Sequence, residues 1–285
     1  MRTIKTLHRA QSAPIADLTT YRALPTNSVE HLDPFLFLNH HGPQTYPARN
    51  RGLPFGPHPH RGFETVTFIL EGDILHQDSG GHRSVIGPGG IQWMTAGRGL
   101  IHSEISSDEF KQTGGPLEIL QLWVNLPARL KMTEPRYTGL QQPEIPAVTL
   151  DEGRVTIHAV SGNWAGTAGA VQPLTDMALA TVNFRQDGRL QLSIAAGRTI
   201  FCYVIRGRLL VNGQEAEARQ LVEFNYDGDD FEARALTDDA VLLLGHAVPF
   251  NEPIVAAGPF VMNSEAEIRQ AYQDYQAGRF GTWTE

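Results

Sequence analysis

Cysteine is almost absent from this 285-residue chain. With Cys202 alone, no disulfide can form within the chain and no metal site can be built from several thiolates. Long hydrophobic runs are missing as well, since none approaches the ~18 residues that a membrane span requires. The first residues also lack the apolar stretch of a secretory signal. These absences predict a cytoplasmic protein that has no membrane partner.

Basic residues are scarce too: 23 Lys and Arg stand against 31 Asp and Glu, for a net charge of −8. A nucleic-acid surface needs clustered Lys and Arg, so we expect no direct contact with nucleic acid. The acidic excess lies in the second half of the chain, which suits a protein partner better. In contrast, nine of the eleven histidines precede residue 143. Because imidazole is the commonest metal-ligand and acid-base side chain, we expect the chemistry in the first half.

Glycine and proline are plentiful, with 28 and 18 residues, and this content favours many turns and short strands. Runs rich in β-formers alternate with glycine clusters in both halves. The predicted strands are 64–70, 74–77, 89–95 and 117–126 in the first half, and 178–184, 190–194, 200–205, 208–211 and 240–244 in the second. This spacing predicts an all-β fold of the sandwich or barrel type.

An internal similarity refines that expectation. Residues 68–75 resemble residues 203–210 at an offset of 135, which predicts two similar β-barrels in tandem. We place an N-terminal metal-binding barrel at 1–130, a proline-bearing linker at 131–146, and a C-terminal barrel at 147–285. A short C-terminal helix is predicted by the capping box of Ser264 and Glu267 and by a stop at Gly278.

The segment 55–64 carries the first candidate site. Side chains two apart on a strand point to one face, so His58, His60 and Glu64 are expected to share a face if a single strand continues through them. Imidazoles among the apolar residues that follow are costly unless their ring nitrogens are satisfied. A bound metal would satisfy them.

A second pair follows about forty residues later, where His102 and Glu104 stand two apart after a glycine-rich turn. If the two pairs face each other across a barrel, they offer three imidazoles and one carboxylate. Such a nitrogen and oxygen set suits iron, manganese, nickel, copper or zinc.

These motifs resemble known families. The His58-x-His60 pair and the later turn before His102 look like the two motifs of the cupin superfamily, although Gly97 stands where proline is usual. The resemblance to the pirin family is closer and spans nearly the whole chain. It rests on the stretches at 57–67, 92–104, 121–127 and 252–263.

The pirin resemblance implies a bicupin whose first barrel holds one divalent transition metal, iron(II) first among the candidates. The implied ligands are His58, His60, His102 and Glu104. It also implies that Glu64 lies just outside the ligands, on the inside of the barrel. The second barrel is expected to be degenerate and metal-free, because the offset of 135 replaces His58 by Ser193 and His60 by Ala195.

Pirin-like proteins are associated with flavonol 2,3-dioxygenase activity, which makes a flavonol such as quercetin and dioxygen the expected substrates. In that reading Glu104 is both a ligand and the general base that takes the hydroxyl proton of the substrate. A second reading, also implied by the resemblance, is a redox-sensitive regulatory protein that acts through protein partners without turnover. A third is a cupin sugar isomerase, which shares the metal site but fits the whole-chain resemblance poorly.

Other polar residues have simpler interpretations. The pair His40 and His41 precedes Gly42-Pro43 and is expected in a solvated loop near the site. His76 and Asp78 are expected to form a structural hydrogen bond on one strand. Arg61 could attract an anion, although its parity is outward.

Overall fold

The computed structural model describes residues 1–284, and their contacts divide the chain into two compact units. The unit that contains the histidine motifs, here called the N-barrel, consists of Ser12–Arg22, Phe35–Gln142 and 250–284. The other unit, here called the C-barrel, consists of Met1–Gln11, Ala23–Pro34 and Pro143–Pro249.

The division predicted at 1–130 and 147–285 differs from this grouping at both ends. Strand β1 (Ile4–Arg9) pairs with β22 (Gln220–Phe224), so the first residues belong to the C-barrel. The terminal segment 250–284 belongs to the N-barrel. Part of the predicted linker also forms a strand, β12 (Arg136–Leu140), which pairs with β9 at the edge of an N-barrel sheet. An edge position tolerates the neighbouring prolines that a central strand would exclude.

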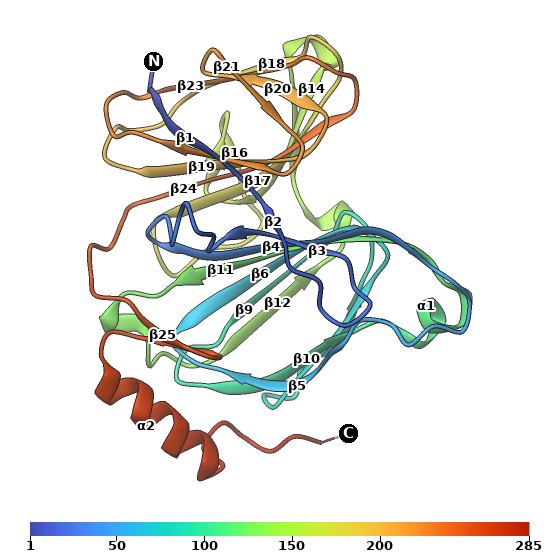
Figure 1. Ribbon diagram of the computed structural model, residues 1–285, viewed down its shortest axis with the longest axis vertical. Coiled ribbons are helices and arrows are strands. Elements are labelled where there is room, and N and C mark those ends of the chain that lie inside the picture. The colour runs from blue at the N-terminus through green and yellow to red at the C-terminus, as the bar shows by residue number, and fades with distance from the viewer. Residues whose placement is uncertain (285) are drawn as a thin grey trace. The chain divides into compact units, whose positions relative to one another are not determined.

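Two antiparallel sheets form the N-barrel, and Figure 1 shows β5 and β10 on one side and β6, β9, β11 and β12 on the other. The larger sheet has the order β12-β9-β6-β11-β4-β3-β2. Besides β12, the larger sheet contains β2 (Gln11–Ser12), β3 (Thr20–Leu24), β4 (Phe35–Tyr46), β6 (Phe63–Glu71), β9 (Ile91–Thr95) and β11 (Gly115–Asn125). The smaller sheet, in the order β5-β10-β7-β8, contains β5 (Phe55–His60), β7 (Ile74–Asp78), β8 (Arg83–Ile86) and β10 (Leu100–Ile105).

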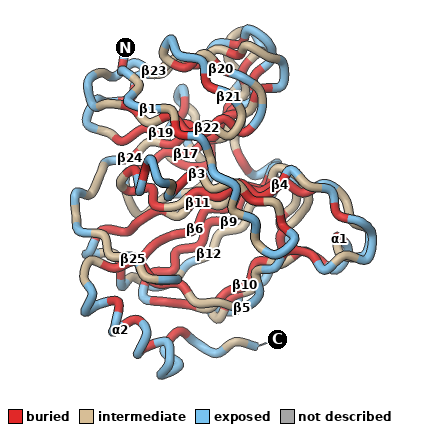
Figure 2. The backbone as a smooth tube through the Cα atoms, viewed as in Figure 1, coloured by how far each residue is buried: buried red, intermediate tan, exposed pale blue. Residues whose placement is uncertain are grey.

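Apolar side chains from both sheets pack together at one end of this barrel. Ile69 and Ile119 of the larger sheet meet Ile74 and Ile86 of the smaller one, all of them buried. Figure 2 shows buried residues along β6, β9 and β11. Apolar packing fills only this end of the barrel. Further along the same strands, polar side chains face the interior and need hydrogen-bond partners there.

The helices follow their local sequence signals. Helix α2 (Glu265–Gln276) begins at Ser264, whose hydroxyl accepts a hydrogen bond from the Glu267 backbone amide, so the predicted N-cap is confirmed. The Glu267 carboxylate accepts from the backbone amide of Asn263 rather than from that of Ser264, as a complete capping box would require. Gly278 follows the helix with a positive φ of 73°. A shorter helix, α1 (Asp108–Thr113), was not predicted and is capped by Ser107. Among the described residues, neither helix is long and apolar enough to cross a membrane.

The C-barrel repeats the two-sheet design. Its larger sheet has the order β1-β22-β19-β24-β17-β14-β13, with β13 (Ala147–Leu150), β14 (Val155–Ser161), β17 (Met177–Phe184), β19 (Thr199–Arg206) and β24 (Ala240–Ala247). Its smaller sheet, β18-β23-β20-β21, contains β18 (Arg189–Ser193), β20 (Arg208–Val211), β21 (Gln214–Glu217) and β23 (Asp230–Ala235). The interior between these sheets is filled by buried apolar side chains. The two similar segments noted in the sequence occupy matching places, one across the β6–β7 turn and one across the β19–β20 turn.

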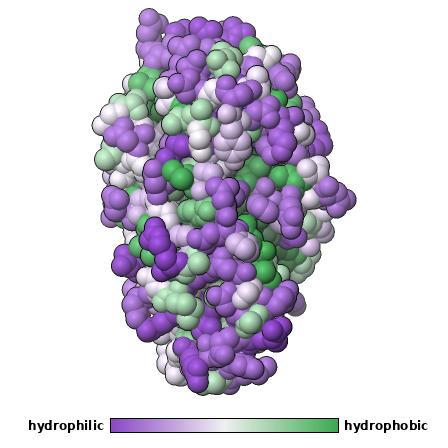
Figure 3. Space-filling view, turned by 90° about the vertical axis from the view of Figure 1, so that its left-hand side faces the viewer, coloured by the Kyte–Doolittle hydropathy of each residue, from purple (hydrophilic) through white to green (hydrophobic). Residues whose placement is uncertain are grey.

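Short elements complete the fold, namely β15 (Asn163–Trp164), β16 (Thr167–Ala168), β25 (Val255–Ala257), β26 (Phe260–Met262) and the 3-10 turns η1 (Ala128–Leu130), η2 (Gln142–Glu144) and η3 (Asp151–Gly153). The strands predicted from the sequence coincide with observed strands to within a few residues. On the face drawn in Figure 3, hydrophilic side chains predominate and apolar ones are scattered among them.

Candidate metal centre

Three histidines meet on the inner face of the smaller N-barrel sheet. Strands β5 and β10 run antiparallel, with His102 directly opposite His58 in the register. His60 lies two residues after His58 on β5, so strand alternation turns it to the same face. The His-x-His spacing thus places His58 and His60 on one face, and the pairing of β10 with β5 adds His102.

Their ring nitrogens converge. One ligand atom from each of His58, His60 and His102 lies within 4.8 Å of the others, and the Nε2 atoms of His58 and His102 are 3.0 Å apart. The Nδ1 atoms of His58 and His60 face backbone carbonyls instead, Gly56 O at 2.7 Å and Pro259 O at 3.2 Å. Such bonds fix the tautomer and leave Nε2 unprotonated and directed inward.

The buried surroundings keep the His60 and His102 rings neutral. Burial, followed by the neighbouring His58 ring, lowers the pKa of His60 to about 3. Burial and the adjacent imidazoles also lower the pKa of His102 well below its usual value. Neutral rings keep the lone pairs that a metal requires.

These side chains fit a metal ion. The Nε2 atoms of His58 and His102 face each other, and His60 brings a third ring nitrogen to the same place. Two nitrogens bound at about 2.1 Å and at a right angle to each other stand about 3 Å apart, as these Nε2 atoms do. The donor set of three imidazoles suits the transition metals named above.

Glu104 shares the inner face but is held by protein side chains. It lies two residues after His102 on β10 and is only 3% exposed. Its Oε1 accepts a hydrogen bond from the Thr67 hydroxyl at 3.0 Å, and its Oε2 accepts one from Gln121 Nε2 at 2.6 Å. The carboxylate is not among the atoms that lie within 4.8 Å of one another. Its role as fourth ligand therefore stays a prediction.

The expectation for Glu64 is wrong. The chain turns at Gly62, where φ is +89°, so β5 ends at His60 and Glu64 begins a different strand in the opposite sheet. On β6 the Thr67 side chain faces Glu104, so Glu64, three residues earlier, points to the other face. There it accepts a hydrogen bond from Thr95 Oγ1 at 2.6 Å, and burial raises its pKa.

His40 and His41 are not in a solvated loop. Both are buried in strand β4, where His40 Nε2 lies 2.9 Å from a Glu118 carboxylate oxygen. His41 Nδ1 lies 2.9 Å from the Thr20 hydroxyl, and burial lowers its pKa to about 3. The strand continues through Gly42, which the glycine and proline signal did not predict.

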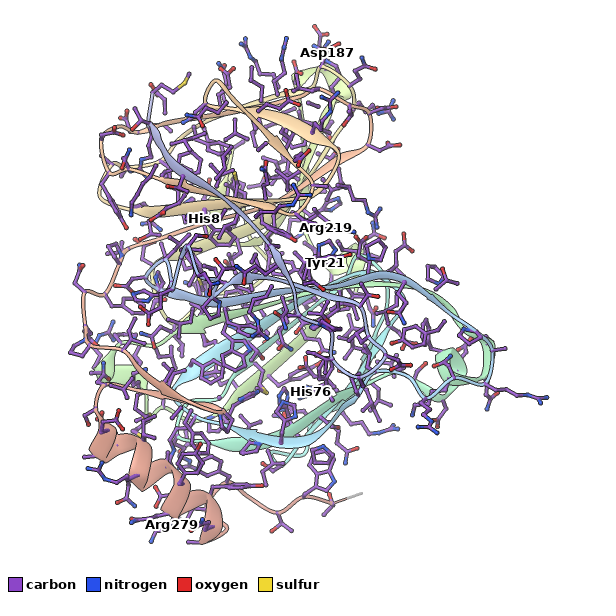
Figure 4. The ribbon with its side chains drawn as sticks, in the orientation of Figure 1. His8, Tyr21, His76, Asp187, Arg219 and Arg279 are labelled. Carbon is purple, nitrogen blue, oxygen red and sulfur yellow. The ribbon has the colours of Figure 1, made fainter. Side chains whose placement is uncertain are left out.

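Two further expectations have clear outcomes. His76 Nε2 lies 3.0 Å from Asp78 Oδ2, which confirms the structural hydrogen bond. Arg61 is buried rather than free to attract an anion, because its Nη1 donates to Asp274 Oδ2 at 2.8 Å. Figure 4 shows His76 between the two sheets of the N-barrel, and its ring stacks on Tyr137 at 3.9 Å.

Sequence reasoning missed the residues that line the larger sheet opposite the histidines. Thr67 and Gln121, which bind Glu104, lie directly opposite each other on β6 and β11. Strand alternation identifies their faces only once the register of the strands is known. An aromatic group, with Trp123 stacked on Phe37 at 4.6 Å and tilted against Phe63 at 4.5 Å, lies next to His60.

The two histidines that follow residue 142 have partners of a different kind. His158 Nε2 lies 3.3 Å from Asn183 Nδ2, and Arg198 Nε donates to His246 Nδ1 at 2.9 Å. Both residues are half-buried, and the His246 ring packs against Trp164 with ring centroids 5.3 Å apart. They do not repeat the convergent arrangement of the N-barrel.

Comparison with known proteins agrees with this architecture. The pirin family matches residues 17–124, and the pirin C-terminal cupin domain matches residues 179–281. A pirin-like protein of Caulobacter vibrioides is 40% identical over 261 residues, which cover 91% of each chain. The crystal structure of a quercetin 2,3-dioxygenase from Acinetobacter baumannii has a TM-score of 0.92 and 33% identity, covering 99% of both chains.

A more distant structure, the Escherichia coli pirin YhhW in complex with nickel(II), is 24% identical, has a TM-score of 0.68 and covers 86% of this chain and 99% of that one. It shares the fold. The similarities extend over nearly the whole length and agree with the two barrels, the histidine motifs on β5 and β10 and the C-terminal helix. The chain therefore belongs to the pirin family, with an N-terminal and a C-terminal cupin domain.

Proposed function

We propose that the protein is a metal-dependent dioxygenase that cleaves flavonols such as quercetin. The convergence of His58, His60 and His102 on the inner face of the N-barrel carries the proposal. The similarity to a quercetin 2,3-dioxygenase over 99% of the chain supports it. Iron(II) is our first candidate for a single bound metal, with manganese, nickel, copper and zinc as alternatives. Glu104 is proposed as the fourth ligand.

The first role of the protein is to hold neutral imidazoles in place. The carbonyl contacts of His58 and His60 orient both rings before any metal arrives. A divalent transition metal bound there supplies Lewis acidity and the redox chemistry that dioxygen requires.

The second role is proton transfer, which we assign to Glu104. As the flavonol binds, its 3-hydroxyl proton passes to a Glu104 oxygen. Thr67 and Gln121 each donate one hydrogen bond to this carboxylate, so it is kept in one orientation while lone pairs remain to accept the proton. The buried position excludes bulk water, which would compete for that proton.

The third role is to hold a planar ring system. Phe37, Phe63 and Trp123 form a stacked aromatic group beside the His60 ring, which lies 5.2 Å from Trp123. Aromatic faces bind flat polyphenols through stacking and burial of apolar area.

The test combines metal content with oxygen consumption. Purified wild type, His58→Ala and Glu104→Gln are compared by plasma mass spectrometry and in an oxygen electrode with quercetin. His158→Ala serves as the matched control, because His158 lies in the C-barrel. We expect metal and oxygen uptake in wild type and control, loss of metal in His58→Ala, and loss of uptake in both N-barrel variants.

Metal bound without oxygen uptake from any flavonol would refute the dioxygenase. It would favour a regulatory protein that binds protein partners according to the oxidation state of its metal. That alternative is then measured as partner binding by the iron(III) and iron(II) forms.

A further inference from the structure

A row of polar residues crosses the inner face of the larger N-barrel sheet. Four side chains lie directly opposite one another on adjacent strands, in the order Asn39, Gln121, Thr67 and Gln92. Residues opposed in this way share one face of a sheet. Because Thr67 and Gln121 reach Glu104 across the barrel, the whole row faces the interior.

Three members of this row have partners within the protein. Thr67 and Gln121 bind Glu104, and Asn39 Oδ1 accepts a hydrogen bond from Arg22 Nε at 3.1 Å. Gln92 is the exception. It is 2% exposed, and neither its Nε2 nor its Oε1 has a hydrogen-bond partner.

An unpaired buried amide is expensive. A buried polar atom that lacks a partner loses its hydrogen bonds to water without replacement, and Gln92 has two such atoms. A leucine or methionine at this place would avoid that cost, so a polar ligand of the interior accounts for the glutamine better than packing does.

The surroundings of Gln92 agree with a ligand of mixed character. Its neighbour on β12 is Gly139, where a Cβ would lie 2.7 Å from the Tyr137 hydroxyl oxygen. Tyr137 in turn stacks on His76, whose Nδ1 is also buried without a partner. Gln92 on the larger sheet and His76 on the smaller one thus place unpaired polar atoms beside the flat ring of Tyr137.

We propose that the Gln92 carboxamide binds a phenolic hydroxyl group on the ring system of the flavonol and so selects hydroxylated substrates. A phenolic hydroxyl both donates and accepts hydrogen bonds, so it can donate to Oε1 and accept from Nε2. Gln92 lies directly opposite Thr67 in the sheet, and Thr67 donates a hydrogen bond to the Glu104 carboxylate. A ligand bound to Gln92 is therefore next to the residue that contacts the proposed base. The inference rests on the proposed function.

The test is a binding series measured without oxygen, so that no turnover is needed. Ligands that gain ring hydroxyls in steps are titrated by tryptophan fluorescence against metal-loaded protein. The series runs from 3-hydroxyflavone to galangin, which has two more hydroxyls, and then to kaempferol and quercetin, which each add one. Wild type is compared with Gln92→Met, which keeps the side-chain length but removes both polar atoms. Gln77→Met, on the outer face of the same barrel, is the matched control.

We expect one step of the series to raise the affinity of wild type and Gln77→Met about tenfold, and the same step to have no effect in Gln92→Met. Equal steps in all three proteins would overturn the inference and leave water as the partner of Gln92. Metal content and circular dichroism verify that each variant is folded and loaded. If Gln92→Met does not fold, Gln92→Leu, which also removes both polar atoms, replaces it and is expected to lose the same step.

The outcomes separate this inference from the proposed function. A wild type that binds no flavonol at all would refute both. A wild type that binds and turns over flavonols, together with a Gln92→Met variant that keeps the hydroxyl preference, would refute only the role of Gln92.

Discussion

Thr67→Val tests whether the hydrogen bonds around Glu104 serve a metal site. The substitution keeps the shape of the side chain but removes the hydroxyl that donates to Glu104 Oε1 at 3.0 Å. A hydrogen bond to a charged group contributes about 1.5–3 kcal/mol. Loss of a residue that orients a metal ligand usually weakens metal binding by about 10- to 100-fold, or about 1.4–2.7 kcal/mol. The two ranges agree, so we expect the metal Kd to rise by about that factor.

The measurement is competition against a chelating dye, with nickel(II) or zinc(II) added to metal-free protein. Thr65→Val is the matched control, because Thr65 is equally buried on the same face of β6 but makes no hydrogen bond to Glu104. An unchanged metal Kd in Thr67→Val would contradict the proposal that Glu104 is a metal ligand. An equal loss in Thr65→Val would show that the effect comes from packing rather than from the carboxylate.

Two further predictions concern groups outside the centre. Burial raises the Glu64 pKa above 4.5, so its contribution to stability is complete below that pH and is lost as the pH rises through the folded-state pKa. Glu64→Gln should therefore become more stable than wild type with rising pH in urea unfolding, and parallel curves would contradict this. Arg61→Met should cost about 3 kcal/mol of unfolding free energy, because it removes a pair whose side chains are 4% and 10% exposed. Arg98→Met, which breaks an exposed pair, should cost less than about 1 kcal/mol, and equal losses would contradict the burial argument.

The histidines of the centre were predictable because the relevant information is local. His58 and His60 share a strand, and alternation alone places them on one face. The same rule applies to His102 and Glu104 on β10. The strands themselves followed from short runs of β-formers between glycine clusters.

Glu64 shows where local reasoning ends. Alternation was extended from His60 to Glu64 as if one strand joined them, but the chain changes sheets at Gly62. A Cβ at Gly62 would lie 2.0 Å from the Val261 carbonyl oxygen, so this position requires glycine. The glycine was visible in the sequence, whereas the close approach of Val261, almost 200 residues away, was not.

The polar row could not have been predicted at all. Gln92, Thr67 and Gln121 lie on three strands that are separated by long stretches of sequence, and only the register brings them opposite one another. The same applies to the termini. The pairing of β1 with β22 joins residues more than 200 positions apart, and no repeat or composition pattern encodes it.

The three histidines that we propose as metal ligands differ from the other histidines in that their ring nitrogens converge on one another, rather than in how deeply they are buried. His40 and His41 are as buried as His102, but each ring meets a side-chain oxygen of the protein, from Glu118 or Thr20. The Nε2 atom of His102 instead faces the Nε2 atom of His58 at 3.0 Å. Two neutral imidazoles can share only one proton between such nitrogens, and the inward Nε2 of His60 adds a third lone pair. A cation at the point where they meet would satisfy all three lone pairs, which is the physical reason why we propose the metal at this cluster rather than at another group of histidines in residues 1–284.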